Sequence, residues 1–584
     1  MINSSIASKI KTLTPFLLIA GMAFGQTPKL SSELQTREFQ AMDPEANLRV
    51  IVQYNHDPSD ADHQRVRNHG GTYHQALHSV RAGSYSVPAS TLSELTADPG
   101  VTHISIDHEI SSKLDYVTAA VTATVAAQQY GVDGTGIGVA LLDSGVTPGA
   151  DFAGRIVYSQ DFTGGNGQDQ YGHGGHVAGI IAGGGDNSHC SSCTRSLQGM
   201  APNANIVNLR VLDQSGVSND STVIAAIETA IRLKAKYNIR VMNLSLGRPV
   251  FESYTQDPLC QAVEAAWKAG IVVVTAAGND GRVDLLPGSN GYGTINAPGN
   301  DPYVITVGAM NTRETYSRND DVLASYSSKG PSLVDGVAKP DLVAPGNMVV
   351  SVLSSRNATL PMLYPGNLIH TIYYNAHGNS TKSSVYYVLS GTSMAAGVVS
   401  GAVADLLQAQ PNLTPDQVKA RLMQTAYKSF PTSSIATDAV TGQTFVDYYD
   451  VLSRGAGYLD LAQALGRRDV GQGSALSPTV KVSRSTRTLC LDFDSSSTWT
   501  WSGTWGINSP NNVWGDAALG ANESIVSTAP VLSNITASSA VWGNSAVWGN
   551  SAVWGNSAVW GNSAVWGTSA VWGTSAVWGN SDRQ

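Results

Sequence analysis

The pattern of apolar and polar positions changes twice along the 584 residues of this chain. In the middle part, short apolar runs alternate with segments in which apolar residues recur every three or four positions. These segments predict strands at 137–142, 206–212, 241–246 and 271–276 and helices at 221–236, 259–268 and 394–408. Such alternation predicts an α/β fold in three layers, with helices on both faces of a parallel sheet.

The part before it, residues 26–115, follows a different pattern. Strand-like stretches lie at 49–54, 84–87 and 101–107, and a helix is predicted at 90–97. This part is therefore expected to form a small α+β unit of its own.

The N-terminus has the features of a signal peptide over residues 1–25. Lys9 and Lys11 precede an apolar run at 16–24, and small residues stand at the expected cleavage positions before Gln26. The run is too short for a stable membrane anchor. We expect an exported protein with no membrane span in its mature form; the alternative is an uncleaved anchor.

The C-terminal part is rich in Ser and Thr. Residues 469–538 contain strand-like pieces at 489–493 and 498–501. A hexapeptide, Ala-Val-Trp-Gly-Asn/Thr-Ser, then fills most of residues 539–584 in seven copies. In extended form its tryptophans would face one way. This predicts either a ladder that contacts a surface or polysaccharide, or a loosely stacked tail.

Composition and charge exclude some classes of protein. Apolar residues make up 42% of the chain and charged residues 14%, so most of it should fold. A net charge of −9 argues against nucleic acid as a partner. The four cysteines are too few for a disulfide scaffold. Cys190 and Cys193 form a candidate local disulfide, and the pairing of Cys260 and Cys490 stays open.

Ser393 precedes the predicted helix at 394–408 and is the first candidate for chemistry. At a helix start the backbone N–H groups lack partners and the dipole favours negative charge. A serine there can attack a carbonyl while nearby N–H groups receive the oxyanion. The alternative is a simple helix cap.

Three further polar residues stand at the ends of predicted elements. Asp143 comes directly after the first predicted strand of the middle part, Asn279 comes just after the strand at 271–276, and His173 precedes a short helical segment. Each is also a common capping or turn residue. In parallel sheets, however, ligands bind at the carboxyl ends of strands. Together these residues predict a nucleophile, a base, an orienting carboxylate and an oxyanion donor.

The sequence blocks around these residues resemble those of the subtilisin-like serine peptidases, in that family's order of Asp, His and Ser. The resemblance extends over about 130–465, which predicts a peptidase domain at 116–468. It is carried by the three blocks and by further motifs at 200–202 (Met-Ala-Pro), 241–247, 339–346 and 455–459.

The resemblance implies roles for individual residues. Ser393 matches the nucleophile, His173 the general base and Asp143 the residue that orients His173. Asn279 and the Ser393 backbone N–H match the oxyanion donors. Substrate strands and the pocket beside the cut are expected at Ser218, Ser245, Leu246, Gly247, Ala276, Ala277 and Gly278.

The family also implies a biological context. We expect a secreted endopeptidase that works through an acyl-enzyme and needs no cofactor for its chemistry. Residues 26–115 are then an inhibitory, folding-assisting propeptide, cut off between about residues 111 and 117. The expected partners are polypeptide substrates and this propeptide, and the mature protein is expected to be a monomer. A structural calcium ion is expected from the family, with no residues assigned to it.

The sequence departs from the family pattern in three places. Gly175 replaces the usual threonine, and Gly397 replaces the proline expected after the nucleophile. An insertion at about 356–386 precedes Ser393 and is expected to shape the cleft. Asp280, at the expected rim of the pocket, favours a basic or polar substrate side chain.

Two rival interpretations come from other classes. His173 and His176, with Cys190 and Cys193, have the spacing of a zinc site. His173 cannot serve as both zinc ligand and base, and export favours a disulfide. The second rival is a surface adhesin that keeps a peptidase fold without catalysis.

Overall fold

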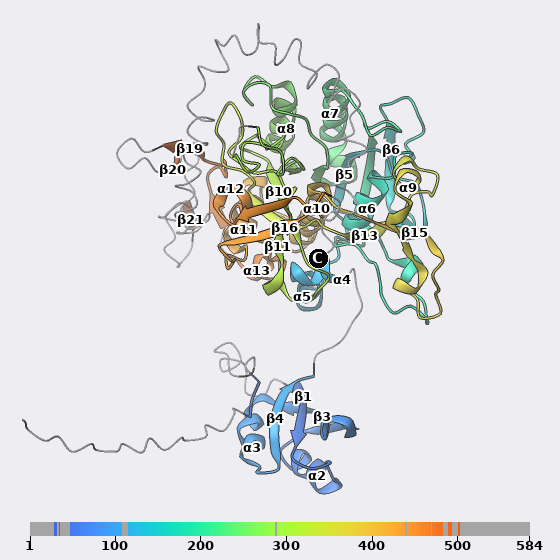
Figure 1. Ribbon diagram of the computed structural model, residues 1–584, viewed down its shortest axis with the longest axis vertical. Coiled ribbons are helices and arrows are strands. Elements are labelled where there is room, and N and C mark those ends of the chain that lie inside the picture. Colours follow the sequence, from blue (N-terminus) through green and yellow to red (C-terminus); the bar gives the residue numbers. More distant parts are fainter. Residues whose placement is uncertain are drawn as a thin grey trace, which may run out of the picture. The chain divides into compact units, whose positions relative to one another are not determined.

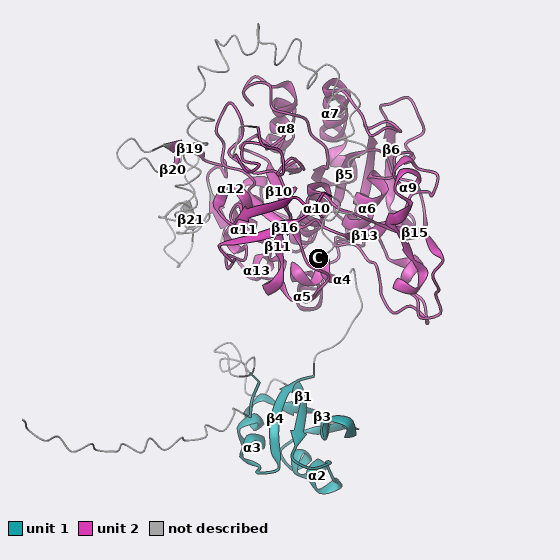
Figure 2. Ribbon diagram, viewed as in Figure 1, with its two compact units in different colours: residues 1–111 teal, residues 112–584 magenta. Residues whose placement is uncertain are grey.

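The computed structural model describes residues 29–31, 34, 47–107, 115–285, 289–438, 441–468, 470–482, 489–492 and 500–502. The chain divides into two compact units, unit 1 (Met1–Ser111) and unit 2 (Ser112–Gln584), shown in Figure 2. The predicted signal peptide and the hexapeptide repeats lie outside the described residues.

Unit 1 is built on a four-stranded antiparallel sheet in the order β2-β3-β1-β4 (Figure 1). Its elements are β1 (Asn47–Tyr54), α2 (Asp60–Asn68), β2 (Thr72–Leu77), β3 (Ala82–Pro88), α3 (Leu92–Ala97) and β4 (Val101–Ile106). The three predicted strands and the helix are present. The sequence pattern missed α2, which is strongly polar, and β2, an edge strand that carries no buried residue.

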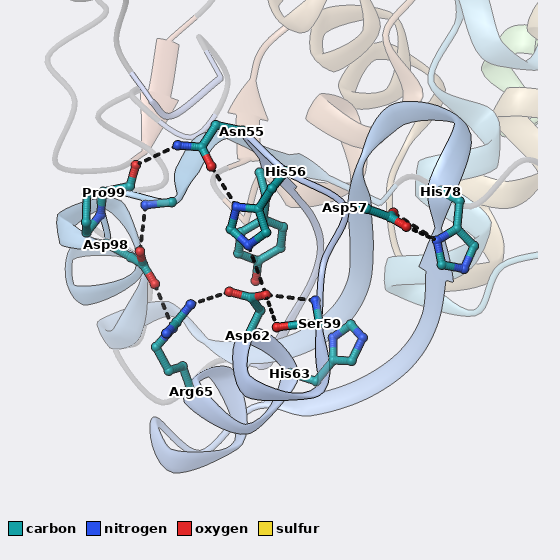
Figure 3. Close-up of polar contacts among 12 residues, drawn as sticks. Asn55, His56, Asp57, Ser59, Asp62, His63, Arg65, His78, Asp98 and Pro99 are labelled. Carbon is teal, nitrogen blue, oxygen red and sulfur yellow. Dashed lines mark hydrogen bonds and ion pairs between the residues drawn. The ribbon is translucent and has the colours of Figure 1, made fainter.

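The start of α2 is held by the polar cluster drawn in Figure 3. Asp62 is 1% exposed and accepts hydrogen bonds from Ser59 N–H (2.8 Å) and Ser59 Oγ (2.6 Å). It also pairs with Arg65, which reaches on to Asp98 at 3.0 Å. The cluster ties the helix to the turn before β4.

The core of unit 2 is a sheet in the order β11-β10-β9-β8-β5-β7-β6, with β12 beside β10. Neighbouring strands are parallel except β10 and β11. The strands are β5 (Gly138–Asp143), β6 (Ile156–Asp161), β7 (Asn205–Arg210), β8 (Ile239–Leu244), β9 (Val272–Ala276), β10 (Ile305–Asn311), β11 (Val322–Leu323) and β12 (Leu342–Pro345). The predicted parallel sheet is therefore confirmed.

Helices cover this sheet in two groups. β5 is buried at every position, as expected for a strand covered on both faces. The helix α10 (Thr392–Ala409) packs on α6 (Gly174–Ala182) and contacts β8, β9 and β10. The second pair is α7 (Asp220–Tyr237) and α8 (Pro258–Lys268), which contact β7 and β9 respectively. The apolar face of each helix fills the space over the strands.

The predicted insertion folds into a small lobe. It contains α9 (Thr359–Leu363), and its strands complete a sheet in the order β13-β15-β14. These strands are β13 (Val349–Val352), β14 (Leu368–His370) and β15 (Lys382–Leu389). β15 leads directly to the start of α10, so the lobe lies next in the chain to Ser393.

The remaining elements surround this core. They are α4 (Asp115–Ala120), α5 (Ala123–Tyr130), α11 (Pro415–Thr425), β16 (Ser433–Thr437), β17 (Thr444–Tyr448), α12 (Val451–Arg454), α13 (Leu461–Gly466), β18 (Val470–Gln472), β19 (Thr479–Val482), β20 (Leu489–Asp492) and β21 (Thr500–Ser502). Among the described residues, none of the helices has the length and apolar content that crossing a membrane requires.

Candidate active site

Asp143 is the last residue of β5, at the carboxyl edge of the sheet. Its side chain is fully buried, and Oδ1 accepts hydrogen bonds from Ser144 N–H and from His173 Nδ1–H, both at 2.7 Å. A strand end gives the carboxylate a fixed position, and the bond fixes the imidazole in the tautomer that leaves Nε2 as the basic nitrogen.

His173 stands directly before α6 and is held by a turn built around Asp169. Asp169 is 3% exposed and accepts hydrogen bonds from the N–H groups of Gly172 (2.7 Å) and Gly175 (2.8 Å). It also accepts one from Ser144 Oγ at 2.8 Å. Asp169 thus connects the backbone on both sides of His173 to the residue after Asp143, a role that no sequence motif indicated.

Two opposing influences act on the pKa of His173. Burial alone would lower it, but the negative charge of Asp143, the hydrogen bond to Asp143 and the charge of Asp169 raise it above its usual value. The surroundings of His173 therefore stabilise its charged imidazole. A general base needs such stabilisation, because it holds a proton during part of the reaction.

Ser393 is the second residue of α10, so its N–H belongs to the first helical turn. Its Oγ donates to the backbone oxygen of Ser245 at 3.2 Å, and its own carbonyl accepts a hydrogen bond from Ser245 Oγ at 2.8 Å. These reciprocal bonds link the helix start to the segment that follows β8.

Asn279 follows β9 and is bonded to the residue before Ser393. Its Oδ1 accepts hydrogen bonds from Thr392 N–H (2.9 Å) and Thr392 Oγ1 (3.1 Å). Because the amide oxygen is engaged in this way, the NH₂ end of the side chain is the end that can serve a ligand.

His173, Ser393 and Asn279 line one cleft of about 270 Å³. Six of the seven predicted substrate-contact residues also line it, namely Ser218, Ser245, Leu246, Gly247, Ala276 and Gly278. Ala277 lies behind the wall: it is fully buried, and its backbone bonds to Val307 and Asn296. Lining residues that the sequence did not indicate include Tyr171, Leu212, Val223, Leu259, Asn296 and Leu360.

Residues 134–457 match the profile of the subtilase family, peptidase S8. The chain belongs to this family. The serine protease AprX of Bacillus subtilis is 36% identical over 344 residues, which cover 57% of this chain and 71% of AprX. Subtilisin E of the same species is 30% identical over 367 residues, covering 62% and 79% of the two chains.

A further sequence relative and a solved structure are also similar to this chain. An extracellular serine proteinase of a Thermus species is 30% identical over 356 residues, covering 59% of this chain and 70% of its own. The crystal structure of a cold-adapted subtilisin-like serine proteinase aligns at 27% identity with a TM-score of 0.38, over 56% of this chain and 90% of that one. The family match and the sequence relatives named serine protease and subtilisin support the conclusion that this chain is a subtilisin-like serine endopeptidase. They argue against the rival interpretation of a non-catalytic adhesin.

The zinc alternative does not fit the geometry. Cys190 and Cys193 are joined in a disulfide, which removes both thiolates. His176 is fully buried and its Nε2 bonds to the backbone oxygen of Val349 at 3.0 Å. Across the described part of the chain, no group of three or more His, Cys, Asp or Glu could hold a metal ion. The structural calcium ion expected from the family therefore stays a prediction without ligands.

The two glycine departures each have a neighbour that explains them. A Cβ on Gly175 would lie 1.9 Å from Ser354 Oγ, which itself donates to Asp169 at 2.7 Å. A Cβ on Gly397 would lie 3.3 Å from Ile180 Cγ2. Gly175 thus makes room for a hydroxyl that supports the His173 turn, and Gly397 allows α10 to pack closely on α6.

Asp280 is turned toward the body of the protein. Its N–H donates to Ser328 Oγ at 3.0 Å, and Asn296 Nδ2 donates to its carboxylate at 3.1 Å. Burial raises the pKa of this carboxyl group. Asp280 is not among the residues that line the cleft, whereas Asn296 is, so Asp280 acts there only through Asn296.

Proposed function

We propose that this subtilase is a secreted endopeptidase whose catalytic triad is Asp143, His173 and Ser393, and that it is made as a self-processed precursor. The observation that carries the proposal is the 2.7 Å bond between Asp143 and His173 at the cleft that Ser393 also lines. The family membership supports the same assignment.

The reaction begins when Ser393 Oγ attacks the carbonyl carbon of the scissile bond. His173 Nε2 accepts the hydroxyl proton, and Asp143 stabilises the resulting imidazolium. His173 then donates the proton to the leaving amine, which departs and leaves an acyl-enzyme on Ser393. Water, deprotonated by His173, attacks the ester and releases the acid and the free serine.

The oxyanion formed in each half of the reaction has two donors, the Asn279 amide NH₂ and the Ser393 backbone N–H. The bonds from Thr392 to Asn279 Oδ1 orient the amide before substrate arrives, so little reorganisation is needed. In subtilisin itself, loss of the side-chain donor is known to cost about 10²–10³ in rate.

Substrate is held as an extended strand. Residues 245–247 and the loop 216–220 line the cleft and offer backbone groups to a chain lying between them, which is β-augmentation. The side chain before the cut enters the pocket that Ala276, Gly278 and Asn296 line.

Unit 1 takes the part of the propeptide in this proposal. It is a compact unit that contains none of the residues that line the cleft, so its removal would leave the cleft residues in place. Processing is expected in two steps, before Gln26 by export and between about residues 111 and 117 by the enzyme itself. N-terminal sequencing of the exported Ser393→Ala precursor locates the first cut, and sequencing of the mature wild-type protein locates the second.

The test of the proposal is the Ser393→Ala variant. It should neither hydrolyse casein nor remove unit 1, so the exported precursor should accumulate with unit 1 still attached. Ser400→Ala, a change on the same helix at a serine whose Oγ donates to Asn243, is the matched control and should mature. A Ser393→Ala chain that still matures and cleaves casein would show that another residue is the nucleophile.

A further inference from the structure

Arg248 joins two segments that line the cleft. It directly follows residues 245–247, and its Nε donates to both carboxylate oxygens of Asp220, at 3.0 and 2.9 Å. Asp220 ends the loop 216–220 and is the first residue of α7. Arg248 and Asp220 are both among the residues that line the cleft. One ion pair therefore connects the two segments between which the substrate chain is proposed to lie.

The same guanidinium is also fixed to the start of α8. Its Nη2 donates to both carboxylate oxygens of Asp257, each at 2.9 Å. Asp257 is fully buried and caps α8, where it accepts a hydrogen bond from the Leu259 N–H at 2.9 Å. A buried carboxylate that loses its positive partner destabilises a protein strongly, so this contact is firmly held. Arg248 thus ties the loop to a fixed point in the fold.

Further contacts restrict the Arg248 side chain and backbone. The Arg248 N–H donates to the Ala297 carbonyl at 2.9 Å, and the Ala297 N–H donates back at 2.8 Å. The Phe251 ring lies against the guanidinium, with its centroid 5.6 Å from Cζ. The helices α7 and α8, which begin at the two carboxylates, pack on each other (Figure 1). A planar, forked guanidinium can serve two carboxylates at once, which a lysine ammonium cannot do in the same geometry.

The other hydrogen bonds described for the loop 216–220 are local. The Gly216 N–H donates to the Asp213 carbonyl at 3.1 Å, and the Val217 N–H donates to the Asp213 carboxylate at 3.0 Å. The residues after them bond within the loop and to the first turn of α7. Among the described residues, the contact of Asp220 with Arg248 is therefore what ties this loop by hydrogen bonds to the segment across the cleft.

We propose that Arg248 is a positioning residue, which fastens the loop 216–220 to the segment 245–247 and so fixes the separation of these two edges before substrate binds. The proposal rests on the proposed endopeptidase function and concerns polypeptides long enough to lie between both segments. A loop that is already ordered loses less entropy when a ligand binds. Because Arg248 acts through Asp220, it should affect the binding of an extended chain more than the chemical steps at Ser393.

The first variant is Asp220→Asn, which removes the charge on the loop side and keeps the buried pair of Arg248 and Asp257. Steady-state kinetics on an extended peptide should show KM raised by about tenfold, with kcat lowered far less. Arg248→Met should raise KM at least as much, because it leaves two neighbouring carboxylates without their shared partner. The double variant should not exceed Arg248→Met alone, since both changes break the same contact.

Arg240→Met is the matched control. Arg240 lies near the start of β8, the strand that leads to residues 245–247, and its guanidinium donates to the carbonyls of Pro411 and Leu413 at 2.7 and 3.0 Å. It is not among the residues that line the cleft, and its variant should keep the wild-type KM.

The outcomes separate a positioning role from a purely structural one. If Arg248 only supported α8 through Asp257, Asp220→Asn would leave KM unchanged, and this result overturns the proposal. Effects of the two substitutions on log KM that simply add, or a fall in kcat without a rise in KM, overturn it as well. Failure of the wild-type enzyme to hydrolyse the peptide would instead overturn the proposed endopeptidase function.

Discussion

At the scale of single residues, the proposed mechanism depends on the paired side chains of Asp143 and His173. In that mechanism the imidazole must be neutral to accept the proton of Ser393. The negative charge of Asp143 stabilises the imidazolium, so it also raises the pH at which the ring becomes neutral. Burial favours the neutral ring, but Asp143 outweighs it and the net effect is a raised pKa. The bond of 2.7 Å between the two side chains is the structural cause.

The pH dependence follows with a definite sign. kcat/KM should rise with pH along an acid limb whose midpoint lies above about 6.5, the ordinary value for histidine. Asp143→Asn removes the charge, so burial should then move the midpoint downward, and the rate should fall by roughly 10⁴ as the imidazole loses its orientation. Initial rates on a short peptide between pH 5 and 9 measure both. A wild-type midpoint at or below the ordinary value, or an unmoved limb in the variant, contradicts this assignment.

At the scale of elements, two helix starts position the proposed catalytic side chains. α6 begins directly after His173, the proposed base, and Ser393, the proposed nucleophile, is the second residue of α10. Each start is supported by side chains from distant parts of the chain. Ser354, which follows β13, supports α6 through Asp169. This support requires a glycine at position 175, because a Cβ there would overlap the Ser354 hydroxyl.

The pair Gly175 and Ser354 is therefore expected to be energetically coupled. Gly175→Thr should destabilise the protein by about 1–3 kcal/mol through overpacking. Ser354→Gly alone should cost about 1 kcal/mol from the lost hydrogen bond to Asp169. The double variant should lose less free energy of unfolding than the two single variants lose together. Thermal unfolding in a Ser393→Ala background, which prevents autolysis, measures the cycle. Strictly additive losses would contradict the overlap.

The first turn of α2 gives a second test at this scale. Burial alone would raise the pKa of Asp62, but the hydrogen bonds from Ser59, with His56 and Arg65, lower it below its ordinary value. A lowered pKa means that Asp62 stabilises unit 1 above about pH 4 and loses this effect as the pH falls below it.

Asp62→Asn should therefore destabilise unit 1 at neutral pH by about 1–2 kcal/mol. Hydrogen exchange of β1 and β3 amides in the full Ser393→Ala chain is the measurement. Asp57→Asn is the control, because Asp57 pairs with His78 at the surface and both side chains are well exposed. Equal effects of the two substitutions would show that the cap contributes nothing specific.

At the scale of the whole molecule, unit 2 extends beyond the residues that match the family profile. Ser477 Oγ donates to Asp341 at 2.5 Å and accepts a hydrogen bond from Lys419 Nζ at 2.9 Å. Lys339 Nζ also donates to Asp341, at 2.7 Å. Backbone bonds join Val480 to Gly336 and Pro478 to Ala338, so this segment closes over a buried ionic cluster.

Removal of this segment should therefore destabilise unit 2. A chain that stops after Ser474 leaves Lys419 and Asp341 without the Ser477 hydroxyl and exposes apolar surface, at a cost of several kcal/mol. A chain that stops after Ser502 keeps the segment and should unfold at the full-length temperature. Calorimetry of both chains in the Ser393→Ala background tests this, and equal unfolding temperatures would rule out a structural role.

The elements that could be predicted from the sequence are those marked by a pattern of neighbouring residues. The strands β5, β7, β8 and β9 are short segments rich in apolar residues, and their boundaries agree with the prediction within two residues. β10 was missed because Thr306 and Gly308 interrupt its apolar run, although every residue in it is buried. Period and apolarity alone do not reveal such strands.

Within the site, Asp143, His173, Asn279 and Ser393 could be proposed because each stands in a motif. Asp169 could not, because its partners come from both sides of His173 and from Ser354, nearly two hundred residues away in the chain. Leu360 was equally hidden, since only the folded insertion brings it to the cleft. Long-range contacts of this kind leave no pattern in a single sequence.

The central claim, that Ser393 is a nucleophile activated by His173, is tested most directly with a fluorophosphonate. Its phosphorus is attacked by an activated serine Oγ, fluoride leaves, and the product is a stable covalent adduct. Mass spectrometry of the treated, digested protein should show one phosphonyl group, on Ser393, that is absent when His173→Ala is treated at the same pH. An adduct on a different residue, or equal labelling of the His173→Ala variant, would contradict the account.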